Sequence, residues 1–382
     1  MLFKCSVEEF SNAIQTVERG VAQRSTIPVL SNIYLEARSD HTLILAANSL
    51  DMGIQVELKA EVKKPGRVLA PSKIISGIAT KLPHGELTFE SSPQHHIRVE
   101  AASSKFVVHG LGAEEFPQLV LPKQPTRCEL PSATLVSMLR QTIFAVSTDE
   151  SKPFLNGILF EGSENGLKLV ATDGYRLALR SEQLPLRDKF KVIIPSRAVN
   201  EALKLILAYP DEEHVVIELS SDLVVFKVAQ VVVVSRLIQG QFPDYQLVIP
   251  AQSDTKISLP RRVFQESAER CSVVASSSNN IIVLELSEDH LLLSANTPEV
   301  GDASEMVKVE VKGINKNKIS FNVRLLLEIL KNMPEGDIQL ELSRRLSPGV
   351  LRPKGQENQF LYIIMPIKTA EPVEAERELV TA

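Results

Sequence analysis

The chain has 382 residues, of which 44% are hydrophobic, so it is long enough to form two or three domains with sizeable cores. Its net charge of −5 argues against a surface that is basic all over, but it does not exclude a local basic surface. The sequence has no run of 18 apolar residues and no apolar N-terminal leader. We therefore expect a cytoplasmic protein without a membrane span.

The first third of the chain predicts two helices among several strands. Ser6-Val-Glu-Glu9 resembles a capping box, and the apolar residues that follow it have helical spacing: Phe10, Ile14 and Val17. A second helix is predicted from about Ser72 to Leu82. Segments with alternating apolar residues, such as 56–59 and 106–109, predict strands between and after these helices.

The other two thirds repeat this order of elements. The helices are predicted near Ser132–Ala145, Ser196–Ala208, Arg262–Ser272 and Val323–Asn332. Asn165-Gly166 predicts a tight hairpin turn in which both residues have positive φ, and Asp173-Gly174 predicts a similar turn. Val231–Val234 is a β-branched run that predicts a fully buried strand.

Three similar segments mark an internal repeat, since their first residues are 124 positions apart: Leu43–Asn48, Leu167–Thr172 and Leu291–Asn296. A repeat of this length indicates a whole domain. A second landmark is a polar residue at the expected N-cap of a helix in each copy: Ser72, Ser196 and Asn322. The pattern predicts three α+β domains, each with two helices on antiparallel sheets. The expected boundaries are 1–124, 125–251 and 252–368, followed by an acidic tail at 369–382.

The sequence contains no phosphate-binding loop, nucleophile elbow or metal-binding motif. The polar groups that could be considered are better explained as strand, loop or turn residues: His95-His96, Asp149-Glu150, Asp211–Glu213, and Asp173 with Arg176. The three cysteines have no metal or disulfide spacing and read as buried apolar residues: Cys5, Cys128 and Cys271. We therefore expect no cofactor, no metal and no enzymatic activity.

The predicted helices carry many basic side chains, and two interpretations stay open. Each helix could have an ordinary solvated face, or corresponding helices of the three copies could form one basic surface. Such a surface would contact phosphates without reading bases. The residues include Arg19, Lys73, Lys81, Arg140, Arg197, Lys204, Arg261, Arg262, Arg270, Arg324 and Lys331.

Five motifs, in order and with matching spacing, resemble the bacterial beta sliding clamp family: Arg24–Pro28 with Leu30–Asn32, Phe154–Gly157, Ala171–Ala178, Gly240–Tyr245 and Tyr362–Pro366. The resemblance covers residues 1 to about 368. It implies a non-catalytic processivity factor built from three DNA-clamp domains. Two such chains would form a six-domain ring around duplex DNA, with domain 1 of one chain against domain 3 of the other.

The resemblance also implies two sets of contact residues. Duplex DNA would be contacted, without sequence preference, by Arg24, Lys152, Phe154 and Arg197, with Lys73 and Lys81 as helix-borne candidates. Lys152-Pro153 departs from the aromatic pair that some family members have there. The interface of the homodimer would contain Lys105, Phe106 and Val108 of domain 1, and Val273, Val274, Glu299, Asp302 and Glu305 of domain 3.

The third implied site is a groove between domains 2 and 3 that captures short linear peptides. Its partners would be the replicative DNA polymerase, the clamp loader and repair polymerases. Its residues would be Leu155, Thr172, Gly174, Tyr175, Arg176, Leu177, Pro243, Leu247, Val248, Pro348, Ile363, Ile364, Met365, Pro366 and Ile367. Leu247 stands where a basic residue is common in the family, and Tyr175 stands where histidine is frequent.

Two other functions are considered beside the clamp. One is a hydrolase or transferase on a repeated α+β domain, which the missing catalytic motifs disfavour. The other is a protein-binding scaffold without DNA contact, which would not need Arg24, Lys73 and Arg197 to face one hole. The tail also allows two interpretations: residues 371–382 could cover the peptide groove, or they could be a flexible appendage.

Overall fold

The computed structural model describes residues 1–22, 25–277, 279–298, 300–343 and 347–368. The chain forms two compact units. The first contains Met1–Leu139, Asp149–Leu167 and Gln183–Gln241. The second contains Arg140–Thr148, Lys168–Glu182 and Phe242–Ala382. Each unit combines helices with antiparallel sheets, in agreement with the predicted α+β class.

The first unit contains an eight-stranded sheet. Its strands are β2 (Asn32–Ala37), β3 (Thr42–Asn48), β4 (Met52–Lys59), β6 (Gly66–Pro71), β10 (Thr126–Pro131), β15 (His214–Leu219), β16 (Leu223–Val228) and β17 (Val231–Arg236). Their order is β10-β15-β16-β17-β4-β3-β2-β6. The β-branched run 231–234 therefore lies in a central strand, between β16 and β4, as the sequence predicts, although Val232 is only partly buried.

A second sheet in this unit has five strands. They are β1 (Leu2–Ser6), β5 (Glu61–Lys64), β7 (Glu86–Ser91), β8 (His96–Ala101) and β9 (Ser104–His109). Their order is β5-β1-β7-β8-β9, so β9 is an edge strand. The unit also contains β11 (Gly157–Ser163), which pairs with β14 (Phe190–Pro195).

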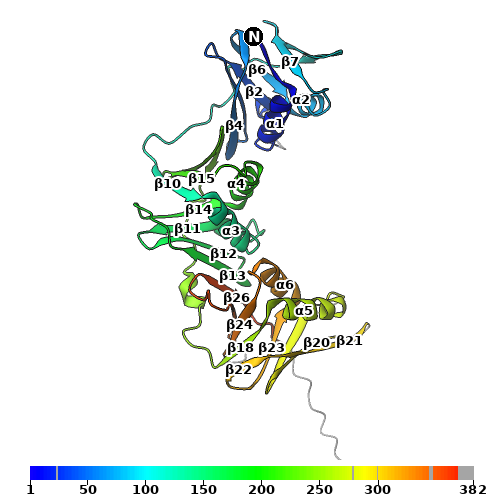
Figure 1. The fold of residues 1–382 in the computed structure, drawn as a ribbon, viewed down its shortest axis with the longest axis vertical. Helices are drawn as coiled ribbons and strands as arrows, with labels where there is room; N and C mark the ends of the chain where they lie inside the picture. The colour runs from blue at the N-terminus through cyan, green and yellow to red at the C-terminus, as the bar shows by residue number, and fades with distance from the viewer. Residues whose placement is uncertain (23–24, 278, 299, 344–346, 369–382) are drawn as a thin grey trace, which may run out of the picture. The chain divides into compact units, whose positions relative to one another are not determined.

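The helices of the first unit are held by large apolar side chains. Helix α1 (Val7–Glu18) packs on β2–β4 through residues with no exposed surface: Phe10, Ile14 and Val17. Phe3 stacks on Phe89 at a ring separation of 4.9 Å beside Phe10. The other helices, labelled in Figure 1, are α2 (Ser72–Ala79) and α4 (Ser196–Ala208). Helix α2 packs on α1, and α4 packs on β16 and β17. Helix α3 spans Ser132–Ile143.

The helix starts match the predicted caps only in part. The Oγ of Ser6 accepts hydrogen bonds from the N–H groups of Glu8 and Glu9, at 3.2 and 3.5 Å, as the capping pattern predicts. Pro71 and Pro195 occupy the N-cap positions where Ser72 and Ser196 were expected. Each serine is the first helical residue instead, and neither helix has a side-chain hydrogen bond from its N-cap.

The second unit contains two more sets of antiparallel strands. The first set is β12 (Gly166–Thr172), β13 (Arg176–Glu182), β18 (Thr255–Pro260), β22 (Glu310–Gly313), β24 (Asp337–Leu342), β25 (Gly349–Pro353) and β26 (Phe360–Ile364), in the order β12-β13-β26-β25-β24-β18-β22. The four-stranded sheet contains β19 (Ile281–Ser287), β20 (His290–Thr297), β21 (Gly301–Lys308) and β23 (Lys316–Asn322), in the order β21-β20-β19-β23.

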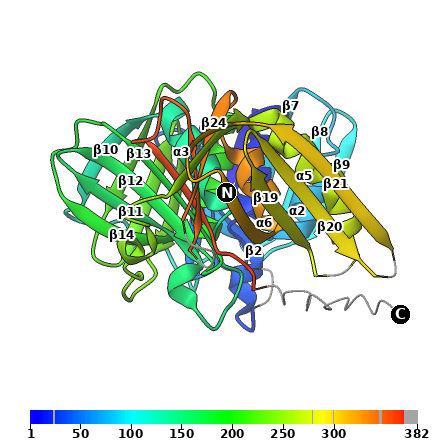
Figure 2. The ribbon, with the colours of Figure 1, turned by 90° about the horizontal axis from the view of Figure 1, so that it is seen from below.

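Two helices pack together in the second unit. Helix α5 (Arg261–Ala275) lies against β18–β21, and α6 (Val323–Asn332) lies against β23 and β26. Figure 2 shows α5 and α6 beside β19, β20 and β21. The predicted cap of α6 is confirmed, because the Asn322 side chain accepts hydrogen bonds from the N–H groups of Arg324 and Leu325. The strand β21 is an edge strand of its sheet.

The predicted turn at Asn165-Gly166 is correct in position and wrong in detail. It joins β11 to β12, but only Gly166 has a positive φ, at 115°. The Asn165 N–H donates to the Ser163 Oγ at 3.3 Å, so a side chain stabilises the turn in place of the expected pair of left-handed residues. The three cysteines are buried thiols, as predicted.

Candidate functional site

The turn between β12 and β13 is fixed by its own polar side chains. The Thr172 Oγ1 donates to the Arg176 carbonyl at 2.6 Å and accepts from the Gly174 N–H at 3.1 Å. The Asp173 carboxylate accepts from the N–H groups of Tyr175 and Arg176 at 2.8 and 2.9 Å. Gly174 has φ of 90°, where a side chain would be strained. Asp173 is therefore a turn residue, as the sequence predicts, and the turn presents Tyr175 to solvent with 68% of its surface exposed.

Arg176 is a buried guanidinium with several partners. Its Nε donates to Asp173 at 3.1 Å, and its other nitrogens donate to Glu328 at 2.5 Å and to the Phe144 carbonyl at 2.6 Å. The guanidinium also lies 5.2 Å from the centre of the Phe144 ring. Satisfied donors make a buried charge tolerable, and the planar fork of arginine suits such an arrangement. Glu328 and Phe144 could not be identified as partners of Arg176 from the sequence, because they are distant in the chain.

The same turn is joined to the last strand of the chain. The Met365 N–H donates to the Tyr175 carbonyl at 2.8 Å, and β13 pairs with β26 so that Arg176 is opposite Ile364. Ile364 is fully buried, whereas Met365 has 36% of its surface exposed. The structure therefore brings together two parts of the predicted peptide groove, the turn at 172–177 and the segment at 363–367.

The other predicted groove residues divide between exposed and buried positions. The 3₁₀ turn Tyr245–Val248 is capped by Asp244 and exposes 83% of Leu247 and 41% of Val248. Pro243 is exposed, and three more residues are partly buried: Pro348, Pro366 and Ile367. Leu177 and Ile363 are buried. Leu155 is buried in the first unit, on the 3₁₀ turn Pro153–Leu155.

The predicted DNA contacts belong to the first unit wherever they are described. Lys73 and Lys81 are exposed on α2 and just beyond it, Arg197 is exposed at the start of α4, and Lys152 is exposed in a loop. Phe154 is partly buried, and Arg24 lies outside the described residues.

Helices α1 and α4 are joined by ionic and polar contacts. The Glu201 carboxylate of α4 forms ion pairs with Arg19 at 3.0 Å and with Lys204 at 2.8 Å. The Arg197 guanidinium donates to the Arg19 carbonyl at 3.3 Å and to the Ser49 Oγ at 3.4 Å. The carboxylate of Glu201 therefore offsets part of the basic charge between the helices, while Arg197 remains exposed to solvent.

The predicted interface residues lie on and beside two edge strands. Lys105 and Phe106 are exposed on β9, whereas Val108 of that strand is buried. Val273 on α5 has 71% of its surface exposed, and Val274 is partly buried.

The acidic members of the predicted interface lie on β21, where they are described. Glu305 pairs with Arg270 at 2.7 Å, and hydrogen bonds from Arg270 lower the pKa of the Glu305 carboxyl. Asp302 accepts a hydrogen bond from the Asn296 amide. Glu299 lies outside the described residues.

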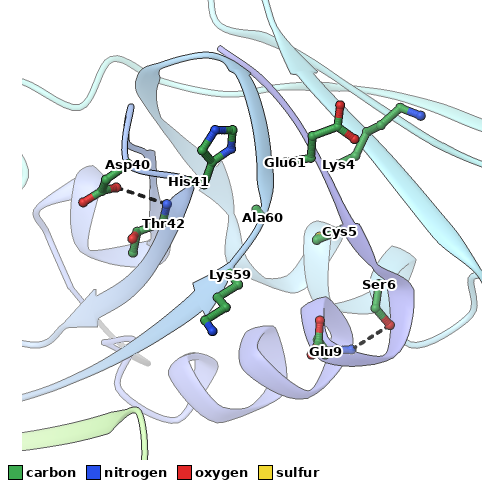
Figure 3. Close-up of a pocket in the computed structure, with 10 residues that line it drawn as sticks. All are labelled: Lys4, Cys5, Ser6, Glu9, Asp40, His41, Thr42, Lys59, Ala60 and Glu61. Carbon is green, nitrogen blue, oxygen red and sulfur yellow. Dashed lines mark hydrogen bonds between the residues drawn. The ribbon is translucent and has the colours of Figure 1, made fainter.

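A mixed-charge pocket in the first unit does not have the properties of a catalytic site (Figure 3). It encloses about 430 Å³ between the start of α1 and the β2–β3 turn, and Cys5 and His41 are among its lining residues. Burial raises the pKa of the Cys5 thiol to about 12, so this thiol is not an activated nucleophile. The His41 Nδ1 accepts a hydrogen bond from the Val62 N–H at 3.2 Å, so this ring nitrogen is engaged with the backbone.

Neither a metal site nor a membrane-spanning helix is found within the part of the chain that the structure describes. In those residues, no group of three or more His, Cys, Asp or Glu side chains is arranged to hold a metal ion. No helix within the same ranges has both the length and the apolar composition needed to cross a bilayer.

Comparison with known proteins gives the same family over most of the described chain. The family descriptions that match are the N-terminal, central and C-terminal domains of the DNA polymerase III beta subunit, at residues 1–120, 129–244 and 246–368. The beta sliding clamp of Synechocystis sp. is 31% identical over 386 residues, which cover 95% of this chain and 98% of that protein. The chain belongs to the beta sliding clamp family.

Other sliding clamps agree with this assignment. The clamp of Staphylococcus aureus is 30% identical to this clamp over 380 residues, which cover 97% of this chain and all of the relative. The DNA polymerase sliding clamp from Bacillus subtilis superimposes with a TM-score of 0.92 at 28% identity, over 97% of this chain and 100% of that chain. The beta subunit from Thermotoga maritima superimposes with a TM-score of 0.90 at 26% identity, again over 97% of this chain and 100% of that chain. This clamp thus has three tandem clamp domains and is a processivity factor, not an enzyme.

Proposed function

We propose that two copies of this clamp close into a ring around duplex DNA and keep the replicative polymerase on its template. The family match over residues 1–368 is the observation that carries this function. We place the domain boundaries at 1–124, 125–251 and 252–368, and the protein in the cytoplasm. A closed ring needs only weak contacts to DNA, because the topological link prevents dissociation while the ring slides.

In this proposal the exposed cations of the first unit face the DNA. Lys73, Lys81, Lys152 and Arg197 would contact phosphates, which carry no sequence information, and Arg24 and Phe154 would complete the set. The contacts would exchange along the duplex as the ring moves. The overall charge of −5 supports this arrangement, since it leaves the rest of the surface unattractive to DNA.

The two edge strands would form the interface between subunits. An edge strand offers unpaired backbone N–H and C=O groups, so β9 of one chain can pair with β21 of another. Phe106 and Val273 supply exposed apolar surface for the centre of such an interface. Lys105 carries a positive charge and Asp302 a negative charge, so the rim would be complementary.

Peptides of partner proteins would bind in the groove formed by the residues named for it from the family resemblance. Tyr175, Leu247, Val248 and Met365 supply its exposed apolar surface, and the unbranched Met365 can adapt to different side chains. The buried Arg176 network keeps the turn at 172–176 in one conformation before binding. We expect micromolar affinity for single peptides, about −8 kcal/mol, so that partners can exchange.

The groove is tested with Leu247→Ala combined with Met365→Ala, using immobilised clamp and the purified replicative polymerase of the same organism. Truncating two exposed anchors should weaken polymerase binding by roughly 10- to 100-fold. Ile314→Ala is the matched control, because Ile314 is also apolar, 56% exposed and in the second unit, but lies outside the proposed groove. Unchanged polymerase affinity in the double variant would exclude these residues as the binding surface.

A further inference from the structure

A second cavity in the first unit has the construction of the proposed peptide groove. It encloses about 190 Å³ and is lined by the turn after β3, by the segment Pro117–Val120 and by the end of β17. Its opening has exposed apolar side chains, since Leu50 is 49% exposed and Val120 is 70% exposed. No residue of this cavity belongs to the predicted DNA, interface or groove sets.

The turn beside this cavity repeats the turn at Thr172–Arg176. Asn48 is 124 residues before Thr172, and each side chain accepts the N–H of the residue two positions later: Leu50 at 2.8 Å and Gly174 at 3.1 Å. Leu50 and Gly174 have similar positive φ values, 73° and 90°. A left-handed leucine is uncommon, so its presence here shows that the repeat has kept this turn geometry without a glycine.

The contact with the following domain is also repeated. The Arg236 N–H donates to the Asp51 carbonyl at 2.8 Å, as the Met365 N–H donates to the Tyr175 carbonyl at 2.8 Å. The pairing register of the strands also agrees between the two copies. Ser235 pairs with Met52, the residue after Asp51, and Ile364 pairs with Arg176, the residue after Tyr175. Each turn is therefore held by the same bond from the last strand of the next domain.

The third wall of the cavity, the segment Pro117–Val120, also has a counterpart in the following copy of the repeat. Phe116-Pro117 is followed by Gln118-Leu119-Val120, and Phe242-Pro243 is followed, after two more residues, by Gln246-Leu247-Val248. Leu119 lies against Gly53, where an added Cβ would be only 2.1 Å from its Cδ2. The cavity thus has three walls, each with a counterpart in sequence among the residues of the proposed groove, and Leu119 forms part of its apolar wall.

The chemistry of the two sites differs most at two exposed positions, where Asp51 is the counterpart of Tyr175 and Arg236 is the counterpart of Met365. Arg236 occupies the place of Met365, and its Nε donates to the Leu50 carbonyl at 3.2 Å. In the described part of the chain, no carboxylate lies within ion-pair distance of Arg236. Asp51 also lines the cavity and would repel a run of acidic groups. The site therefore favours a single carboxylate next to an apolar side chain.

We propose that this cavity is a second peptide-binding site, which accepts a short extended segment with one leucine-sized side chain and one carboxylate. The inference rests on the proposed function of the first groove, of which it is the copy. A volume of about 190 Å³ can hold one such side chain, because apolar cavities of about 150 Å³ bind benzene. The carboxylate would pair with the guanidinium of Arg236.

The test uses the full-length clamp and a pentapeptide, Ser-Glu-Leu-Leu-Ser, in which the first leucine is replaced by photo-leucine. Cross-linked residues are mapped by mass spectrometry. We expect cross-links to the 48–53 or 117–120 segments, besides any at the first groove. Arg236→Gln, or glutamine in place of the peptide's glutamate, should reduce the cavity cross-links by about tenfold, the effect of losing one charge-assisted hydrogen bond.

A second variant tests the cavity without changing its charge. Ser235→Ile introduces the residue found at the counterpart position and fills the cavity, so cavity cross-links should be lost while dimer mass is unchanged. Cross-links confined to Tyr175, Leu247 or their neighbours would overturn this inference and leave the first groove intact. Cross-links at the cavity alone would support it and count against the first groove. A peptide that cross-links at neither site, or equally in all variants, would overturn the inference.

Discussion

Replacing Arg176 by methionine should destabilise the second unit and reshape the turn that carries Tyr175. Methionine retains much of the side-chain volume but donates no hydrogen bond. The change leaves the Phe144 carbonyl and one oxygen of Asp173, whose side chain is only 17% exposed, without the donor that they have in the native structure. Glu328 is 50% exposed, so water can replace most of its ion pair with Arg176.

The size of the effect follows from these partners. Each mostly buried acceptor that loses its donor costs about 1–2 kcal/mol, and loss of the contact over the Phe144 ring adds about 0.5 kcal/mol. The expected loss is therefore about 3 kcal/mol. In a unit of this size that corresponds to a fall of roughly 6–12 °C in the midpoint of its thermal unfolding transition.

Differential scanning calorimetry of the full-length clamp measures this midpoint. Arg324→Met is the matched control, because Arg324 is an exposed arginine on α6 of the same unit, and its replacement should shift the midpoint by less than about 2 °C. Arg176→Lys should restore only part of the loss, since one ammonium cannot reproduce the guanidinium fork. If Arg176→Met behaves like Arg324→Met, the proposed role of this network in holding the turn is wrong.

Three further predictions concern other parts of the molecule. Burial raises the pKa of the Cys5 and Cys128 thiols to about 12 and about 11, so iodoacetamide at pH 8 should alkylate them only after unfolding. The folded thiols retain protons that unfolded thiols lose above pH 9.0, so the free energy of unfolding should fall as the pH rises towards these values. Urea titrations at several pH values measure this fall. Lys73→Glu and Arg197→Glu should each make DNA binding less dependent on salt, lowering the slope of the logarithm of the binding constant against the logarithm of salt concentration by about 0.9. An unchanged slope would exclude that residue from the phosphate contacts. Phe106→Asp should shift the mass in solution from dimer towards monomer, and a stable dimer in this variant would exclude Phe106 from the interface.

The repeat and the helices could be predicted because they depend on local patterns. Apolar spacing at Phe10, Ile14 and Val17 identifies α1, and the Asn322 cap identifies the start of α6. The predicted caps at Ser72 and Ser196 are wrong, because each of these helices begins at the serine itself and has the preceding proline as its N-cap.

The candidate sites depended more on resemblance than on local pattern. The turn at Asp173 could be predicted from its own residues, because its hydrogen bonds join neighbours in sequence. The partners of Arg176 could not, since Phe144 and Glu328 are 32 and 152 residues away. The cavity near Leu50 was also missed, because its turn lacks the glycine that marks the homologous turn.

In the proposed function, the clamp holds DNA by enclosing it as a ring. The measurement is mass in solution by light scattering, together with retention of loaded clamp on nicked circular DNA before and after the DNA is linearised. We expect a dimer of two 42.2 kDa chains that stays on the circle at high salt and slides off once the circle is cut. A monomer, or retention that survives linearisation, would contradict it.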